Sequence, residues 1–556
     1  MYLPFLLQAH SFSPHSCLVL PKVYAFILFS LLLGVSSFFK NSRSVRWDRL
    51  AVSVYLFIGY LLVATVVIGG RSLEILKLVG FLLLFLYFKG SELDNKHLNV
   101  VIVLLYLSQA IYGLLQYFQV VHVSSAFPIV GSFDNPAGFA ACLAVAFPLA
   151  FSLFKQSGYY RWLAIVAMLV MACAVVLSES RAGIVSVGVV CAIFFFTQLP
   201  ERLKKFRKLL IPLFLVVGVV AFLLLLSMKQ DSVSGRVLIW QSTWAMIQDA
   251  PIFGHGNGAF LAHYMNYQAD YFAQNPESRF AMLADNVLHP FNEYLLLVAE
   301  FGLVGLALLL IALFFLFKSA KMDSPYLLCL MALAVFSLFS YPLKYPFVWV
   351  VAAYCVAQIS KQQTAIFTLS FWKWLKIPAL AGLLIGVYFL AKDISFEYQW
   401  NKIAQRSLVG KTVEMMPEYE RLHPRWNGNP LFLFNYGAEL HHIGRHEKSN
   451  IVFHQCLRYF NDYDVQMLLA DNYFHLERWD RAEYHFIRAA NMCPVRFRPL
   501  GRLMNLYYTM GRYEEALEMA VKIRGKPVKV MSATVRRIQL EAEEMMENLR
   551  VPLYRR

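Results

Sequence analysis

The sequence predicts an all-α protein in two parts: a polytopic transmembrane helical bundle of about twelve spans and a C-terminal, extracytoplasmic α-solenoid. Apolar residues make up 58% of the 556 residues, and the mean hydropathy is +0.51. A soluble chain of this length is less apolar. After residue 391 the composition becomes polar and charged, and short sequence elements recur at a fixed spacing. The chain therefore divides into a membrane part, residues 1–391, and an outer part.

Apolar segments mark the predicted spans, because about 20 helical residues cross the roughly 30 Å of hydrocarbon in a bilayer. The spans are expected at residues 23–39, 49–68, 73–88, 98–120, 137–154, 161–178, 182–198, 209–227, 293–317, 325–341, 345–359 and 374–391. No basic segment precedes the first span. We therefore expect this span to act as an uncleaved targeting signal.

Lysine and arginine gather in every second short loop, and this asymmetry predicts the orientation of the spans. The cytoplasmic loops are expected to hold Lys40, Arg43, Arg46, Arg49, Lys89, Lys96, Lys155, Arg161, the run 202–208, Lys318, Lys321, Lys361, Lys373 and Lys376. Residues 121–136, 179–181, the long loop 228–291 and everything after 392 are then outside. Most of the net charge of +16 comes from this pattern, which leaves little support for nucleic-acid binding.

The outer part repeats itself. Related segments begin at Gly444, Glu477 and Gly511, with spacings of 33 and 34 residues, and each leads from one helical segment into another. This period and the small residues at the helix crossings resemble tetratricopeptide repeats. We expect a linker at 392–425, the repeats at 426–530 and a C-terminal tail at 531–556. Such a stack is typical of a docking module for a protein partner, although a scaffold that braces the membrane part is the alternative.

Cysteine and aspartate patterns give no support to a metal site. Six of the eight cysteines lie in or near predicted spans, where cysteine acts as a small apolar residue. Cys456 and Cys493 are 37 residues apart in the outer part, and we expect both to be free thiols. Asp462-Tyr463-Asp464 is expected to be a solvated helix terminus. We predict no metal and no cofactor.

Two short segments on the outer side carry candidate binding residues. Residues 131–136 contain Asn135 before Pro136, which predicts a binding loop or an ordinary helix start with an asparagine cap. Residues 178–183 contain Ser180 and Arg181, squeezed between two spans. An arginine at this depth is costly unless it faces a wet cavity or an anion. Pairing of Arg181 with Glu179, or extension of its side chain to the interface, are the alternatives.

The long outer loop predicts a surface helix that begins at Arg236. Val237, Trp240, Trp244 and Ile247 follow at helical spacing, so we expect them to face the membrane, with both tryptophans as interface anchors. A cation at the start of a helix suggests phosphate binding together with the free amide groups. The glycine-rich residues 254–258 predict a turn, with His255 as a turn residue.

The segment from His289 to Tyr294 is the strongest candidate for chemistry. His289 has an ordinary pKa of about 6.5, which suits proton abstraction near neutral pH. Asn292 and Glu293 follow within one helical turn and could orient the imidazole or a substrate hydroxyl. Glu300 lies about two turns later and precedes Gly302 and Gly305. A buried carboxylate in a span is a functional candidate, and a structural hydrogen bond is the alternative.

These segments, in this order, resemble the O-antigen ligase superfamily. They read G-S-F-x-N-P, S-R-A-G, R-x-x-x-W with P-x-x-G-x-G-x-G-x-F, and H-P-F-N-E-Y-L with E-x-G-x-x-G, within residues 20–391. The superfamily includes lipopolysaccharide O-antigen ligases, O-antigen polymerases and bacterial protein O-oligosaccharyltransferases. The resemblance implies a metal-independent enzyme of the bacterial inner membrane that transfers a preassembled glycan from undecaprenyl diphosphate to a hydroxyl on the periplasmic face.

The resemblance also implies roles for individual residues. Arg181 and Arg236 match arginines that hold the lipid diphosphate, and His289 matches a histidine that engages the acceptor hydroxyl. Many members have H-x-H-N where this chain has Phe291, so a two-histidine mechanism is in doubt here. The acceptor could be lipid A-core, a protein Ser or Thr, or another lipid-linked repeat; we favour the first two. A transporter for lipid-linked glycans and a membrane anchor for the repeats are alternatives of other classes.

Overall fold

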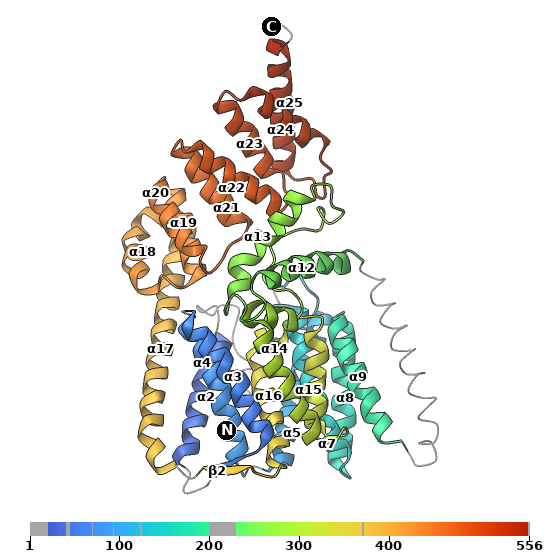
Figure 1. Ribbon diagram of the computed structural model, residues 1–556. Helices are drawn as coiled ribbons and strands as arrows, with labels where there is room; N and C mark the ends of the chain where they lie inside the picture. Colours follow the sequence, from blue (N-terminus) through green and yellow to red (C-terminus); the bar gives the residue numbers. More distant parts are fainter. Residues whose placement is uncertain are drawn as a thin grey trace. The chain divides into compact units, whose positions relative to one another are not determined.

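The computed structural model describes residues 21–39, 45–68, 70–92, 94–122, 125–199, 230–369 and 372–553. The chain forms two compact units (Figure 1). Unit 1 consists of Met1–Met228 and Phe291–Tyr398, and unit 2 consists of Lys229–Pro290 and Gln399–Arg556. The long loop between the predicted spans thus belongs with the C-terminal repeats, which the sequence does not reveal.

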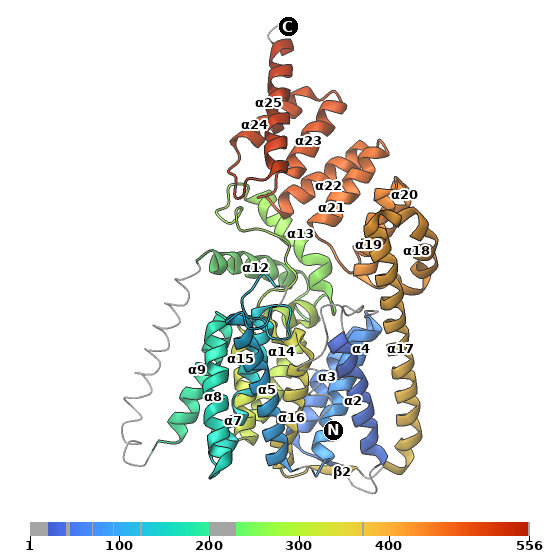
Figure 2. The ribbon, with the colours of Figure 1, turned by 180° about the vertical axis from the view of Figure 1, so that it is seen from behind.

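Unit 1 is a bundle of apolar helices that run side by side (Figures 1 and 2). Its helices are α2 (Pro21–Phe39), α3 (Arg49–Val67), α4 (Ser72–Gly90), α5 (Asn95–Tyr117), α6 (Pro136–Ala146), α7 (Leu149–Phe154), α8 (Tyr159–Leu177), α9 (Arg181–Thr197), α14 (Glu293–Ser319), α15 (Pro325–Ser337), the 3-10 turn η1 (Pro342–Lys344), α16 (Pro346–Lys361) and most of α17 (Trp372–Arg406). They coincide with the predicted spans, except for 209–227, which lies outside the described residues.

Among the described residues, seven helices are long and apolar enough to cross a membrane by length and composition. Three shorter apolar helices, α9, α15 and α16, accompany them. α4 matches a predicted span but carries Glu74, Lys77 and Lys89. The molecule is therefore a multi-pass helical membrane protein, and the count of about twelve spans stays a prediction.

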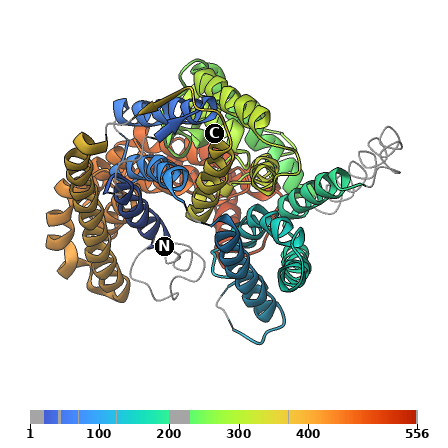
Figure 3. The same ribbon diagram turned by 90° about the horizontal axis from the view of Figure 1, so that it is seen from below.

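Small residues allow close helix packing in the middle of unit 1. α6 reads Pro-Ala-Gly-Phe-Ala-Ala-Cys-Leu-Ala-Val-Ala, and 83% of the apolar window that it forms with α7 is buried. It packs against α5, α8, α9, α15 and α16, and Figure 3 shows the helices of the bundle end-on. Without a hydrophobic driving force between helices in lipid, such small residues bring helix backbones within van der Waals contact.

One element of unit 1 was not expected. β1 (Val45–Trp47) pairs with β2 (Phe367–Leu369) as an antiparallel ribbon, with Arg46 opposite Thr368. Trp47 stacks on Phe367 at a ring distance of 6.0 Å. β-branched and aromatic residues favour such pairing, but the two segments are far apart in the sequence and neither alternates over a long enough stretch to predict a strand.

Unit 2 contains two helices of the long loop and the helices of the C-terminal part. The former are α12 (Gln230–Asp249) and α13 (Ala259–Gln274); the latter are α18 (Thr412–Trp426), α19 (Pro430–His442), α20 (His446–Cys456), α21 (Tyr463–His475), α22 (Trp479–Met492), α23 (Arg498–Thr509), α24 (Tyr513–Gly525) and α25 (Ala533–Leu553). Residues 392–425, predicted as a linker, are helical: they hold the end of α17, the π-helical turn η2 (Ser407–Lys411) and α18.

The repeat spacing corresponds to three equivalent turns between paired helices. Gly444, Glu477 and Gly511 adopt left-handed conformations, with φ of 77°, 55° and 74°. In each turn the next residue's N–H donates to a carbonyl five positions earlier, as from Arg478 to Tyr473 at 2.9 Å. This is the Schellman pattern that ends a helix. The turns join α19 to α20, α21 to α22 and α23 to α24 (Figure 1). That the stack is of the tetratricopeptide type stays a prediction.

Candidate active site

Four apolar helices of unit 1 begin with a capping residue or a proline. Asn135 caps α6, its Oδ1 accepting from the N–H of Gly138 at 2.9 Å. Ser180 caps α9 through the N–H of Gly183 at 3.3 Å. Asn292 caps α14, accepting from two backbone N–H groups at 3.0 Å each. α16 begins with Pro346, directly after Tyr345. These caps satisfy backbone donors that the helices leave unpaired.

Contacts between these helix starts place them at the same end of the bundle. The Asn135 amide donates to the Tyr345 hydroxyl at 2.9 Å, which joins α6 to α16. The N–H of Leu343 donates to Glu293 at 2.8 Å, which joins α14 to the segment before α16. A Cβ on Gly183 would lie 3.0 Å from the Ala140 side chain, so the first turns of α9 and α6 touch. Since each helix dipole is positive at its N-terminus, this end of the bundle attracts anions.

Arg181 and Lys344 are among the cations at this end, together with Lys22, which donates to Ser132. Arg181 is the first residue of α9 and is half-buried. Lys344 forms an ion pair with Asp134 at 3.0 Å, and its side chain keeps 42% exposure. The sequence did not predict Lys344 or Tyr345 as site residues, and the Tyr345 hydroxyl also contacts Asp134 at 3.2 Å. The available signal was a lone outer lysine between two tyrosines, Tyr341 and Tyr345.

The predicted catalytic residues Asn292 and Glu293 both have structural contacts. Asn292 caps α14, and Glu293 accepts the N–H of Leu343. Phe291 has φ of 54° and packs its ring 5.4 Å from that of Tyr341. These contacts fix the start of α14 beside Lys344 and Tyr345. Direct contact of Asn292 or Glu293 with a substrate stays a prediction.

α14 is broken at Gly302, in the predicted E-x-G-x-x-G motif. Gly302 has φ of 66° and ψ of −169°, a conformation open almost only to glycine. Beside this break, the hydroxyl of Tyr60 on α3 donates to the carbonyl of Phe301 at 2.9 Å. Backbone groups freed within a membrane need such a partner. Glu300 precedes the break and is buried, with 8% exposure.

His289 and Arg236 both belong to unit 2. The expectation that Arg236 begins a helix is wrong, because α12 already includes Gln230 and Arg236 lies in its second turn. Trp240, one turn after Arg236 on the same face, donates its indole N–H to the Pro290 carbonyl at 2.9 Å. Arg236 therefore lies about one helical turn, ~5–6 Å, from Trp240, which is hydrogen-bonded to the residue after His289.

The surface-helix prediction for α12 is corrected in part. Its buried face consists of Leu238, Ile239, Ser242, Thr243, Met246 and Ile247, and α12 packs against α13. Trp240 is half-buried and holds Pro290, so it is not a free interface anchor, whereas Trp244 is 56% exposed. His255 lies in the predicted turn, with its Nε2 2.7 Å from the Met246 carbonyl, between glycines with positive φ.

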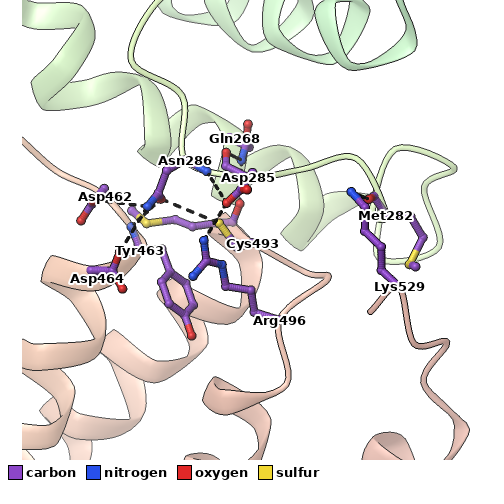
Figure 4. A network of polar contacts seen from close by, with 11 residues as sticks. Gln268, Met282, Asp285, Asn286, Asp462, Tyr463, Asp464, Cys493, Arg496 and Lys529 are labelled. Carbon is purple, nitrogen blue, oxygen red and sulfur yellow. Dashed lines mark hydrogen bonds and ion pairs between the residues drawn. The ribbon is translucent and has the colours of Figure 1, made fainter. Parts of the chain in front are cut away.

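The segment that leads to His289 is held by the C-terminal helices (Figure 4). The Asn286 amide donates to Asp462 at 3.3 Å and to Asp464 at 3.4 Å, and its oxygen accepts the N–H of Tyr463 at 3.1 Å. Asp285 pairs with Arg496 at 2.8 Å. Unit 2 is thus a single body in which the repeats fix a residue three positions before His289.

Asp462-Tyr463-Asp464 lies at a helix terminus as predicted, but the expectation that it is solvated is wrong for Asp462. Asp462 caps α21 by accepting from Val465 at 2.9 Å and is only 8% exposed, because residues 285–286 cover it. Burial raises the pKa of Asp462 to about 6. Cys456 and Cys493 are buried free thiols, as expected.

Comparison with known families agrees with the motifs. The family model described as O-antigen ligase matches residues 166–310. The match contains Ser180, Arg181, Arg236 and His289 and ends in α14, beyond the break at Gly302. No curated protein matches the chain. Residues 166–310 are therefore similar to the O-antigen ligase family, in agreement with the order of the motifs.

Proposed function

We propose that this protein is a metal-independent glycosyltransferase of the bacterial inner membrane. It transfers a preassembled glycan from undecaprenyl diphosphate to a hydroxyl acceptor on the periplasmic face. The observation that carries the proposal is the group of four helix N-termini beside Arg181 and Lys344 in unit 1, inside or next to the matched ligase domain. Aligned helix dipoles and guanidinium groups bind phosphate oxygens.

The proposed step is a displacement at the anomeric carbon of the first sugar. The acceptor oxygen forms a bond to this carbon, and the bond from the carbon to the diphosphate oxygen breaks. His289 takes the hydroxyl proton as general base. Undecaprenyl diphosphate leaves with the bonding electrons and one additional negative charge. Arg181 and Arg236 stabilise this charge, in the role that a divalent cation has in other enzymes.

Other predicted residues act through position. Asn135 and Ser180 hold the starts of α6 and α9, so that their backbone N–H groups and Arg181 face the same anion. Asn292 and Glu293 hold the start of α14. Trp240 fixes Pro290 and with it the backbone next to His289.

For the acceptor, we propose lipid A-core or a protein Ser or Thr, with another lipid-linked repeat as the alternative. The helix pairs of unit 2 support a macromolecular acceptor, because they join directly to the segment that carries His289. A polymerase that uses its own donor as acceptor has no need of such an added body. The outer domain is proposed to lie in the periplasm.

The test is glycan transfer in proteoliposomes. Wild type and the variants Arg181→Ala, Arg236→Ala and His289→Ala receive undecaprenyl-diphosphate glycan with lipid A-core, an acceptor protein or donor alone. We expect kcat to fall about 10²–10⁴-fold for His289→Ala and about 10²–10³-fold for each arginine variant. The acceptor that gains glycan identifies the subgroup.

Two variants serve as matched controls. Arg161 is an exposed arginine whose Nε donates to the Phe154 carbonyl, and His97 is an exposed histidine beside Asp94; both lie at the predicted cytoplasmic end. Arg161→Ala and His97→Ala should keep wild-type transfer. Full transfer by His289→Ala would remove His289 from the chemistry.

A further inference from the structure

A cavity of about 490 Å³ lies in unit 2, between α13 and helices α20 to α22. Its lining includes Asn266, His454, Gln466, Arg481, Tyr484 and His485. α13 comes from the same 229–290 segment as Arg236 and His289. The cavity is large enough for a few sugar rings, and ligand pockets in proteins fall in this size range.

The cavity has positive charge without a matching carboxylate. Arg481 and Arg488 line it, whereas no Asp or Glu is among its lining residues in the described part of the chain. Arg488 is already neutralised by an ion pair with Asp270. Arg481, in contrast, forms no ion pair with any described residue. Its guanidinium is therefore available to pair with an anionic ligand.

Arg481 is held in place before any ligand binds. Its Nη1 donates to the Tyr473 hydroxyl at 3.3 Å, and its guanidinium lies 5.6 Å from the Tyr473 ring. Tyr473 is fixed in turn, because its hydroxyl lies 2.9 Å from His454 and its ring stacks on His485 at 5.5 Å. A side chain held in this way loses little entropy when it binds.

The neighbouring imidazoles of His454 and His485 carry no positive charge that would bind the anion. Burial, and then the charges of His454 and Arg481, lower the pKa of His485 to about 4, and burial also lowers the pKa of His454. Both rings are therefore neutral hydrogen-bonding groups at pH 7. Among the described residues, no three His, Cys, Asp or Glu side chains converge as metal ligands.

The remaining lining groups suit a carbohydrate. Tyr484 presents its ring with 61% exposure, and the C–H face of a pyranose packs well on such a ring. Asn266 and His485 provide amide and imidazole groups for sugar hydroxyls, and the buried Gln466 holds His485 in place through a contact of 2.7 Å. A glycan moved as a block also extends beyond the reacting sugar, so the enzyme must accommodate its outer residues.

We propose that this cavity binds a carboxylate-bearing sugar of the transferred glycan, with Arg481 pairing the carboxylate and Tyr484 stacking on the ring. The glycan substrate is therefore acidic. This inference rests on the proposed glycan transfer. It concerns binding alone, so it is tested without lipid donor or turnover, and its failure leaves the transfer assay untouched.

The experiment measures binding to the purified full-length protein in nanodiscs by isothermal titration calorimetry or ligand-observed NMR. The probes are trigalacturonate, the neutral trisaccharide maltotriose and the peptide triglutamate. We expect trigalacturonate to bind at least about tenfold more tightly than either of the others, which corresponds to ~1.4 kcal/mol. Arg481→Gln should weaken trigalacturonate binding about tenfold, and Tyr484→Ala should weaken it without removing the preference for the acid.

Lys522→Gln is the control, because it removes one positive charge from an exposed site on α24, away from the cavity. It should leave the affinity unchanged, and thermal unfolding should show that Arg481→Gln is folded. Equal binding of maltotriose and trigalacturonate, or an Arg481→Gln variant with wild-type affinity, would overturn the proposal. Tighter, Arg481-dependent binding of triglutamate would assign the cavity to an acidic peptide instead.

Discussion

Asp462 is a buried carboxyl whose protonation is coupled to the folding of unit 2. Burial raises its pKa from 3.8 to about 6, so folding takes up a proton between these pH values. The free energy of unfolding therefore has a component that falls as the pH rises from about 4 to about 6 and is constant above. Asparagine caps a helix as well as aspartate does.

We predict that Asp462→Asn removes this pH-dependent component. The free energy of unfolding of the variant minus that of wild type should be about 1–3 kcal/mol larger at pH 7 than at pH 4. One pKa unit corresponds to about 1.4 kcal/mol. Thermal unfolding of the purified protein at pH 4, 5, 6 and 7 measures the effect. Asp480→Asn, at an exposed carboxylate on α22, should follow wild type. Parallel curves for wild type and Asp462→Asn would contradict the assignment.

Glu477 carries a backbone strain that its repeat equivalents avoid. Its φ is 55°, whereas Gly444 and Gly511 occupy the same position in the neighbouring turns. Side chains other than glycine cost roughly 1–2 kcal/mol in this region. We predict that Glu477→Gly stabilises unit 2 by about 0.5–1 kcal/mol, after the higher entropy of glycine in the unfolded chain is subtracted. Gly444→Ala should destabilise it by about 1 kcal/mol. Chemical unfolding measures both, and a destabilised Glu477→Gly variant would show that the turn needs the side chain.

At the scale of elements, the break in α14 sets the position of its first turn. Gly302 has a conformation that alanine rarely adopts, so Gly302→Ala should cost about 1–3 kcal/mol. We predict that it also lowers glycan transfer, because Glu293 and Asn292 move with the start of α14. Thermal unfolding and the transfer assay measure the two effects. Gly59→Ala is the control, since a Cβ on Gly59 in α3 meets no neighbour within 4 Å. Wild-type behaviour of Gly302→Ala would mean that the helix can close across the break.

The contact between residues 285–286 and the repeats positions the segment that leads to His289. Asn286→Ala removes the donors to Asp462 and Asp464 and the acceptor for Tyr463. We predict that kcat for transfer falls about tenfold, or ~1.4 kcal/mol, while KM for the lipid donor stays near wild type. Asn275→Ala, at the exposed end of α13, is the matched control. A rise in KM at unchanged kcat would show that Asn286 serves donor binding and does not position His289.

The sequence predicted those elements whose formation depends on residues close together in the chain. Apolar segments gave the helices of the bundle, and Asn135 before Pro136 marks a helix start that the structure confirms. The 33- and 34-residue spacing indicated three equivalent turns, of which the turn at Glu477 lacks glycine. Caps and periodicities act over a few residues, so one sequence is enough to detect them.

Contacts between distant segments could not be predicted in this way. Asp462 reads as an exposed helix cap, because the residues that bury it, 285–286, precede it by more than 170 positions. Lys344 and Tyr345 contact Asp134 and Asn135 because α16 packs against α6 in the folded protein. The sequence did not predict the pairing of β1 with β2, because the two strands are remote in sequence. It placed the start of α12 too late, because the first residues of this helix lie outside the predicted segment.

At the scale of the whole molecule, the segment that matches the O-antigen ligase model contributes residues to both units. The match at residues 166–310 includes Arg181 in unit 1 and Arg236 and His289 in unit 2. Unit 2 also contains the C-terminal repeats, so the residues proposed to engage the acceptor belong to the same body as the repeats. This arrangement predicts that acceptor recognition and chemistry depend on one another, which an independent tail would not require.

The release of undecaprenyl diphosphate during transfer distinguishes a glycosyltransferase from a transporter of lipid-linked glycans. Wild-type protein in proteoliposomes receives radiolabelled undecaprenyl-diphosphate glycan, acceptor and EDTA, and both products are quantified over time. We predict one molecule of undecaprenyl diphosphate for each glycan bound to acceptor, at a rate that EDTA does not change and that His289→Ala lowers about 10²-fold or more. Intact donor that crosses the bilayer without being consumed would contradict the account and identify a transporter.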